Sequence, residues 1–143
     1  MSPGPTFEWW PADRILIHEQ IDPVRVQKLA RQMQRTGVCD TPIYIDRATG
    51  VLLDGHHRYA ALLRLGATRI PVWAFDYEDD SVISIRRWRP GPPISRAEVV
   101  RRARAGELFP PKTTRHVVHV KLPAHPVRLS EALAAAPADG ATG

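Results

Sequence analysis

The sequence has a single cysteine, Cys39, which excludes both an internal disulfide and a C-x-x-C redox or zinc pair. It has no apolar run long enough to cross a membrane, and its first residues lack the basic and apolar regions of an export signal. We therefore expect no membrane partner and a cytoplasmic location. Three histidines, His18, His119 and His125, lack the spacing of metal ligands, so we expect no zinc site.

The charge balance is basic, at +5 with a pI near 10.0, and indicates anionic partners. Nucleic acid and phosphorylated metabolites are both anionic, so composition alone does not choose between them. The hydrophobic content of 43% and the length of 143 residues suit one domain with a modest core. An arginine cluster falls on a predicted helix and is interpreted as its solvated face: Arg96, Arg101, Arg102 and Arg104.

The order of residue patterns predicts alternating helices and strands. Asp22-Pro23 is typical of a helix start and Gly37 of a helix end, with Val26, Leu29, Ala30 and Met33 on the inner face and Arg25 on the outer one. Residues 42–46 and 51–53 form a predicted hairpin, and a second helix runs from the turn at residue 55 to Gly66.

Further elements follow along the chain. Strands are predicted over 70–75, 82–86 and 117–120, and a capping box at Ser95-x-x-Glu98 starts a helix that ends near Gly106. Residues 1–8 are expected to be a flexible leader and residues 123–143 a flexible Ala/Pro-rich tail, with a weak helix over 130–136 as an option. The predicted domain of residues 9–122 is α+β, with a small mixed sheet and about three main helices around it.

The most informative segment is Leu53-Asp54-Gly55-His56-His57-Arg58-Tyr59-Ala60. An apolar run ends at an Asp-Gly turn, and a helical pattern begins directly after it. The start of a helix has unpaired backbone N–H groups and a positive dipole end, both of which attract anions. With His56, His57 and Arg58 added, the segment is a candidate phosphate site. The alternative is an ordinary turn whose histidines are solvated or cap the helix.

This segment, with Leu65-Gly66 and Ile70-Pro71-Val72, resembles the nucleotide-binding motif of the ParB/sulfiredoxin superfamily. Two more segments make it most similar to the free-serine kinases: Ile17-His18-Glu19 and the residues from Phe109 to His116. The resemblance runs from about Trp9 to His119. It implies a small mixed sheet with packed helices, ATP or ADP as the phosphate donor, and magnesium.

The resemblance also implies roles for two carboxylates. Glu19 stands where the kinases have their catalytic glutamate, so we expect it to take the proton from the acceptor hydroxyl. Its alternatives are a metal ligand or a surface glutamate before a helix. Asp54 ends a strand beside the phosphate site and is the candidate Mg²⁺ ligand, because magnesium prefers one or two carboxylates together with phosphate oxygens. Its alternative role is to stabilise the turn.

A second group of polar residues is the candidate substrate site. The loop after Pro110 and Pro111 carries Lys112, Thr113, Thr114, Arg115 and His116, which suit a substrate carboxylate or a phosphoryl oxygen. A basic surface loop is the alternative. Trp88, between Arg87 and Arg89, is expected from the resemblance to line the substrate pocket, and a core or rim aromatic is its alternative.

These residues predict a kinase that converts free L-serine to O-phospho-L-serine, with threonine, homoserine or another small hydroxy amino acid as other acceptors. The alternative is a ParB-like nucleotide-binding switch associated with DNA or a partner protein. Nucleic acid binding is the less favoured reading, because the residues after Val120 are too few and too Ala/Pro-rich for a helix-turn-helix domain. Sulfiredoxin chemistry is disfavoured because His56, and not a cysteine, occupies the motif.

Overall fold

The computed structural model describes residues 4–134. Its main sheet has four strands in the order β1-β5-β3-β4, formed by β1 (Thr6–Pro11), β5 (Arg69–Phe75), β3 (Ile43–Asp46) and β4 (Leu52–Asp54). β3 pairs with β5 in parallel, whereas the other two pairings are antiparallel, so the sheet is mixed. The predicted α+β class and the predicted hairpin of β3 and β4 are confirmed.

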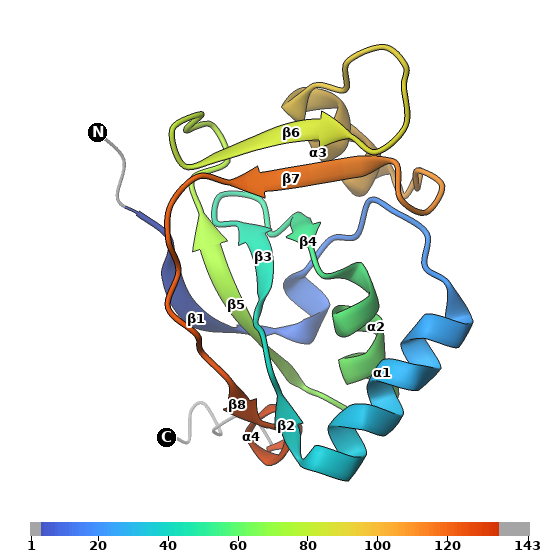
Figure 1. Cartoon of the computed structure of the whole chain (residues 1–143), viewed down its shortest axis with the longest axis vertical. Helices are drawn as coiled ribbons and strands as arrows, with labels where there is room; N and C mark the ends of the chain where they lie inside the picture. Colours follow the sequence, from blue (N-terminus) through green and yellow to red (C-terminus); the bar gives the residue numbers. More distant parts are fainter. Residues whose placement is uncertain (1–3, 135–143) are drawn as a thin grey trace.

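The two helices that lead to the site begin and end at the residues that the sequence indicates. In α1 (Pro23–Thr36), the Asp22 side chain accepts a hydrogen bond from the Val24 N–H, and Gly37 closes the helix with φ of 72°. The second helix, α2 (His56–Arg64), follows β4 after one residue. Figure 1 shows α1 and α2 side by side below the loops that surround the candidate site.

The remaining strands form two separate pairs. β6 (Ile83–Arg87) pairs antiparallel with β7 (Thr114–Val118), and α3 (Arg96–Ala105) lies between them in sequence. β2 (Val38–Cys39) pairs with β8 (Val127–Arg128), and a short 3-10 helix, η1 (Ala12–Arg14), follows β1. Among residues 4–134, no helix is both long and apolar enough to cross a membrane.

Two buried apolar clusters hold these elements together. The first packs α1 and α2 against the sheet and includes Met33, Leu62 and Val72. The second lies beneath β6, β7 and α3 and includes Phe75, Tyr77 and Val99. The candidate site lies between the elements that the two clusters support, so its position depends on the packing of both clusters.

The structure corrects the expected bounds of the domain. Residues 6–8 belong to β1, and Phe7 pairs with Trp73 of β5, so this part of the expected leader is ordered sheet. In the expected tail, β8 is followed by α4 (Leu129–Leu133), whose Leu129 and Ala132 are buried in the first cluster. These apolar side chains explain the difference, because they find partners far away in sequence. Residues 1–3 and 135–143 lie outside the described range.

Leu129 provides a test of this correction. We expect Leu129→Ala to lower the free energy of unfolding by about 2–4 kcal/mol, because it removes a buried side chain and leaves a cavity. Leu133→Ala in the same helix is the matched control, since Leu133 is 39% exposed. Urea denaturation of the two variants gives the comparison. Equal, small effects would mean that α4 contributes nothing to the core.

Candidate functional site

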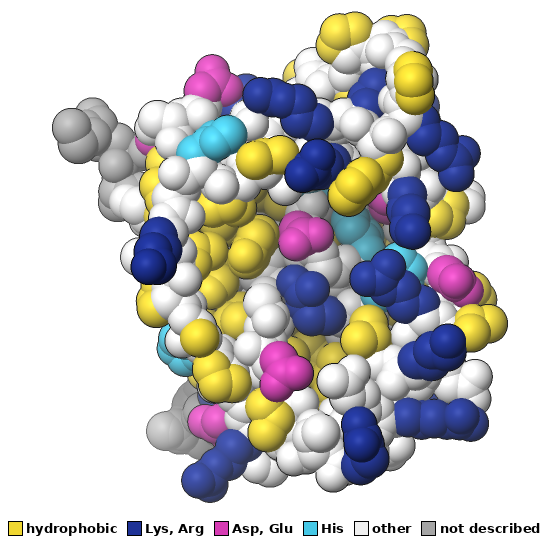
Figure 2. Space-filling view, in the orientation of Figure 1, with side chains coloured by type: hydrophobic (Ala, Val, Ile, Leu, Met, Phe, Trp, Pro, Cys, Tyr) yellow, Lys and Arg dark blue, Asp and Glu magenta, His cyan; other side chains and the backbone are white. Residues whose placement is uncertain are grey.

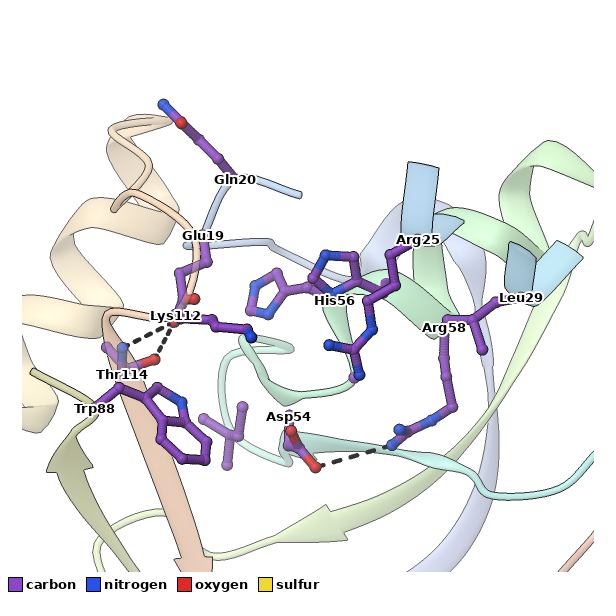
Figure 3. Close-up of a pocket in the computed structure, with 13 residues that line it drawn as sticks. Glu19, Gln20, Arg25, Leu29, Asp54, His56, Arg58, Trp88, Lys112 and Thr114 are labelled. Carbon is purple, nitrogen blue, oxygen red and sulfur yellow. Dashed lines mark hydrogen bonds and ion pairs between the residues drawn. The ribbon is translucent and has the colours of Figure 1, made fainter. Parts of the chain in front are cut away.

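A cavity of about 230 Å³ opens where the segment before α1, the β4–α2 turn and the start of β7 converge. Figure 3 shows its lining side chains converging on one space from these separate elements. Figure 2 shows Lys and Arg side chains around this hollow. The lining residues are Glu19, Gln20, Arg25, Leu29, Leu53, Asp54, Gly55, His56, His57, Arg58, Trp88, Lys112 and Thr114.

The start of α2 forms one wall of the cavity. Gly55 is the N-cap with φ of 107°, and no side chain caps the helix. The backbone N–H groups of the first turn have no helical partner by geometry, so this end can bind an anion. A Cβ at position 55 would lie 2.8 Å from Ile43 Cγ2 and 2.9 Å from Arg58 Nη2. Both the positive φ and this close approach require glycine here.

The two histidine rings of the motif hold the chain segment that precedes α1. His56 Nε2 accepts a hydrogen bond from the His18 N–H at 3.1 Å, and His57 Nε2 accepts one from the Asp22 N–H at 3.0 Å. Burial lowers the pKa of both rings, well below the usual value for His56. Each Nε2 acts as an acceptor, so both rings are neutral in this arrangement. The groups that they leave free for an anion are the backbone N–H groups of the helix start.

Glu19 lies on the opposite side of the cavity with its carboxylate held at the start of β7. Its Oε1 accepts from the Thr113 N–H at 3.4 Å, and its Oε2 accepts from the Thr114 N–H at 3.1 Å and from the Thr114 hydroxyl. The segment is fixed by backbone bonds with Phe109 on each side, at 2.8 Å. Glu19 is only 8% exposed. A carboxylate held by so many donors has a defined direction, as a proton acceptor requires.

Asp54 and Arg58 lie at the rim of the cavity. The Asp54 carboxylate is 55% exposed and lies 3.9 Å from Arg58 Nη2. The same Nη2 donates to the Pro42 carbonyl at 3.2 Å, which anchors the guanidinium without using its other N–H donors. Among residues 4–134, no three His, Cys, Asp or Glu side chains gather into a metal site. A single accessible carboxylate beside a phosphate site still fits magnesium, which takes its other ligands from phosphate and water.

The structure divides the residues expected from the 112–116 loop. Lys112 reaches into the cavity from a backbone with φ of 57°, and Figure 3 shows its side chain extending between Glu19 and His56. Thr114 lines the cavity, and Thr113 contributes its backbone N–H to Glu19 while its hydroxyl donates to the Pro110 carbonyl. These residues lie together as the sequence predicts.

The other two residues of that loop lie elsewhere. Arg115 is exposed and stacks over the Trp88 ring at 5.0 Å, outside the cavity lining. The His116 ring lies beneath the site, where its Nε2 is 2.7 Å from the Tyr77 hydroxyl, and burial lowers its pKa to about 3. Trp88 itself lines the cavity and is 55% exposed, so it is a rim aromatic.

Four lining residues were not anticipated as site residues: Gln20, Arg25, Leu29 and Leu53. Arg25 and Leu29 are one helical turn apart on α1, which places them on one stripe of that helix. The sequence pattern placed Arg25 on the solvated face of its helix, and Arg25 is exposed. It nevertheless lines the cavity, together with residues of α2. For Gln20, the only signal in the sequence is that it directly follows Glu19.

No family model matches. The chain is 37% identical over 82 residues to the ATP-dependent L-serine kinase of Staphylothermus marinus, covering 54% of this chain and 32% of that one. It is 31% identical over 94 residues to the ADP-dependent L-serine kinase SerK of Thermococcus kodakarensis, covering 63% and 38%. A ParB-like protein of Sulfolobus acidocaldarius is 47% identical over 47 residues, covering 33% and 23%.

The chain thus spans about a third of the length of the two kinases to which it is similar. Among solved structures, a free serine kinase in complex with AMP matches with a TM-score of 0.77 at 17% identity, covering 92% of this chain and 95% of that one. SbnI with a C-terminal truncation, from Staphylococcus aureus, matches with a TM-score of 0.76 at 16% identity, covering 87% and 88%. The resemblance inferred from the sequence motifs is confirmed: this chain has the fold of the free serine kinases and is similar in sequence to L-serine kinases.

Proposed function

We propose that this chain is a nucleotide-dependent kinase that phosphorylates the hydroxyl group of free L-serine. One observation carries the proposal: a fixed carboxylate, Glu19, faces the uncapped start of α2 across a cavity that also holds Lys112. Phosphoryl transfer needs donors for the phosphates and a group that accepts the proton of the attacking hydroxyl. The similarity to L-serine kinases supports serine as the acceptor.

In this proposal, the N–H groups at the start of α2 hold the phosphates, Arg58 neutralises the charge on them, and Lys112 binds the carboxylate of serine. Glu19 accepts the proton of the serine hydroxyl as the bond to phosphorus forms. Trp88 covers the rim of the substrate site, and Thr113 and Thr114 orient Glu19 through their N–H groups. Asp54 would hold magnesium, which when bound supplies further neutralisation of the phosphate oxygens.

The donor is ATP or ADP, and relatives of both kinds exist. Phosphorus NMR with magnesium, ATP or ADP, and a panel of hydroxy amino acids tests donor and acceptor together. We expect a new phosphomonoester signal with L-serine. A signal with threonine or homoserine alone would keep the chemistry and change the substrate. Tight nucleotide binding without any transfer would contradict the kinase and favour a nucleotide-binding switch, to which the similarity to a ParB-like protein points.

Arg58→Ala is expected to weaken nucleotide binding. The variant removes a positive charge beside the phosphate site, and charge-assisted hydrogen bonds are worth about 1.5–3 kcal/mol, or roughly 10- to 100-fold in affinity. Isothermal titration calorimetry with ADP measures the change. Arg64→Ala is the matched control, since Arg64 lies on α2 but is exposed and away from the cavity. Unchanged affinity in Arg58→Ala would remove Arg58 from the phosphate site.

Lys112→Ala is expected to raise the KM for serine more than the KM for the nucleotide, because Lys112 extends into the cavity beside Glu19, on the proposed acceptor side. Arg115→Ala is the matched control on the same loop, and it should have the smaller effect because Arg115 lies over Trp88 outside the cavity. Initial rates with each substrate varied in turn separate the two constants. A larger effect on the nucleotide KM would assign Lys112 to the phosphate side.

A further inference from the structure

His18 is a buried polar residue next to the proposed base, and it lies outside the lining of the cavity. Its exposed fraction is 0%. The ring packs edge-on against His56 at 4.6 Å and His116 at 5.8 Å between centroids, with Phe109 at 6.2 Å. An apolar side chain would fill this space without the cost of burying polar nitrogens, so the imidazole calls for a specific explanation.

The hydrogen bonds around Thr114 supply that explanation. The Thr114 hydroxyl lies 2.9 Å from His18 Nε2 and also contacts the Glu19 carboxylate through Oε2. A hydroxyl has only one proton to donate, and a carboxylate can only accept. The Thr114 proton therefore goes to Glu19, and the Thr114 oxygen accepts from His18. This order requires His18 to carry its proton on Nε2.

The charge state of His18 agrees with this order. Burial lowers the pKa of His18 to about 4, so the ring is neutral at pH 7. Nδ1 is buried and has no hydrogen-bond partner among the described residues, so it can be the nitrogen without a proton. A neutral ring has one N–H and one acceptor nitrogen, and the contact with Thr114 determines which is which. The backbone on either side is fixed as well, since the His18 N–H donates to His56 and the His18 carbonyl accepts from Phe109.

We infer that His18 is a positioning residue for the proposed reaction: its Nε2–H orients the Thr114 hydroxyl, which in turn holds the Glu19 carboxylate toward the cavity. The inference rests on the proposed kinase function. Without the ring donor, the Thr114 hydroxyl rotates among its staggered positions and no longer directs its proton to Glu19 alone. The carboxylate then loses one of its three donors and part of its fixed direction.

The kinetic test compares His18→Leu with His18→Gln. Leu removes the donor, and a misplaced catalytic group can cost up to about 100-fold, so we expect a fall in kcat of about 10- to 100-fold with the nucleotide KM nearly unchanged. The Gln amide nitrogen reaches about the position of Nε2 and can donate, so we expect rescue to within a few fold of the wild type. Equal loss in both variants, or a loss in KM only, would overturn the positioning role.

A double-mutant cycle tests the route through Thr114. Thr114→Val keeps the shape and removes the hydroxyl, and Thr114→Ser keeps the hydroxyl as its control. In the Thr114→Val background, we expect His18→Leu to cause little further loss, because the two residues act through one hydrogen-bond chain. Additive effects would show that His18 acts by another route. If His18→Leu does not fold, His18→Met, which also lacks a donor, takes its place in the cycle.

Nitrogen-15 NMR of the imidazole rings tests the hydrogen-bond order without any turnover. We expect His18 in the wild-type protein to be protonated on Nε2, with slower exchange of that proton than in Thr114→Val. Protonation on Nδ1 would overturn the inference directly, even in a fully active enzyme. A wild-type protein with the Nε2–H form but no phosphoryl transfer would instead refute the proposed function, and it would leave His18 as an orienting group for Thr114 and Glu19 without a role in catalysis.

Discussion

Replacing Glu19 with glutamine should abolish measurable turnover, with kcat lowered by about 10²- to 10⁴-fold, and leave nucleotide affinity within a few fold of the wild type. Glutamine has nearly the same size, and its one oxygen can replace Oε2, which accepts from the N–H and the hydroxyl of Thr114. Only the long contact of Oε1 with the Thr113 N–H, at 3.4 Å, is lost. Its amide cannot take up the proton of the acceptor hydroxyl. The chemical step therefore loses its base while the phosphate site at the start of α2 keeps its geometry.

Two measurements separate these effects. Phosphoserine formation gives kcat, and calorimetry with ADP gives nucleotide affinity. Glu78→Gln is the matched control, because Glu78 is an exposed carboxylate away from the cavity. Full activity in Glu19→Gln would remove Glu19 as the base. A parallel loss of nucleotide affinity would mean instead that the substitution has disturbed the site as a whole.

Acid should lower the free energy of unfolding of this protein. Two buried histidines and the partly buried His116 lie together beneath the site, and desolvation lowers the pKa of each: to about 4 for His18, to about 3 for His116, and well below the ordinary value for His56. Each ring takes up a proton more readily in the unfolded chain, whose histidines titrate near pH 6.5. The unfolded state thus binds more protons, and stability falls as the pH drops below about 6.5.

The size of the effect follows from linkage. At pH 5, a buried histidine that stays neutral costs about 2 kcal/mol relative to neutral pH, and the loss for His18 and His116 continues down to about pH 4 and about pH 3. Three such groups approach the whole stability of a small domain, which is about 5–15 kcal/mol. Urea denaturation at pH 7, 6 and 5 measures the loss.

His56→Gln is the matched variant for this experiment. Its side-chain oxygen can accept the His18 N–H in place of Nε2, and it does not titrate. We expect the slope of unfolding free energy against pH near pH 5 to fall by about 1.4 kcal/mol per pH unit, the value for one proton. An unchanged slope would mean that His56 does not take up a proton on unfolding.

Local patterns determined the elements around the site. The Asp22 cap, the Pro23 start and the Gly37 end fix α1 within a few residues, and each acts on neighbouring backbone groups alone. The positive φ of Gly55 and the start of the helix after it likewise follow from the local Asp-Gly sequence. The fold class and the start of α2 after Gly55 were therefore predictable from the sequence.

Pairings between distant segments were not predictable in the same way. Phe7 and Leu129 lie in stretches whose composition indicates flexibility, yet β5 and the first core cluster provide partners for them. The periodicity of apolar residues and the composition describe how apolar a segment is, but they do not identify the distant surface that packs against it. The expected leader and tail were consequently wrong at residues 6–8 and 127–133.

The sequence alone identified three candidates: the motif at residue 55 and the loop at Lys112, because each carries an unusual group of polar residues, and Glu19, because of the resemblance to the free-serine kinases. Only the tertiary structure decided which side chains share the cavity: it brought Glu19 to the Thr114 N–H across 95 residues, added Arg25, and turned Arg115 away. The physical reason is that hydrogen bonds and burial depend on distance in space. The same packing made His56 and His57 neutral acceptors, since their rings meet backbone N–H groups that no local pattern reveals.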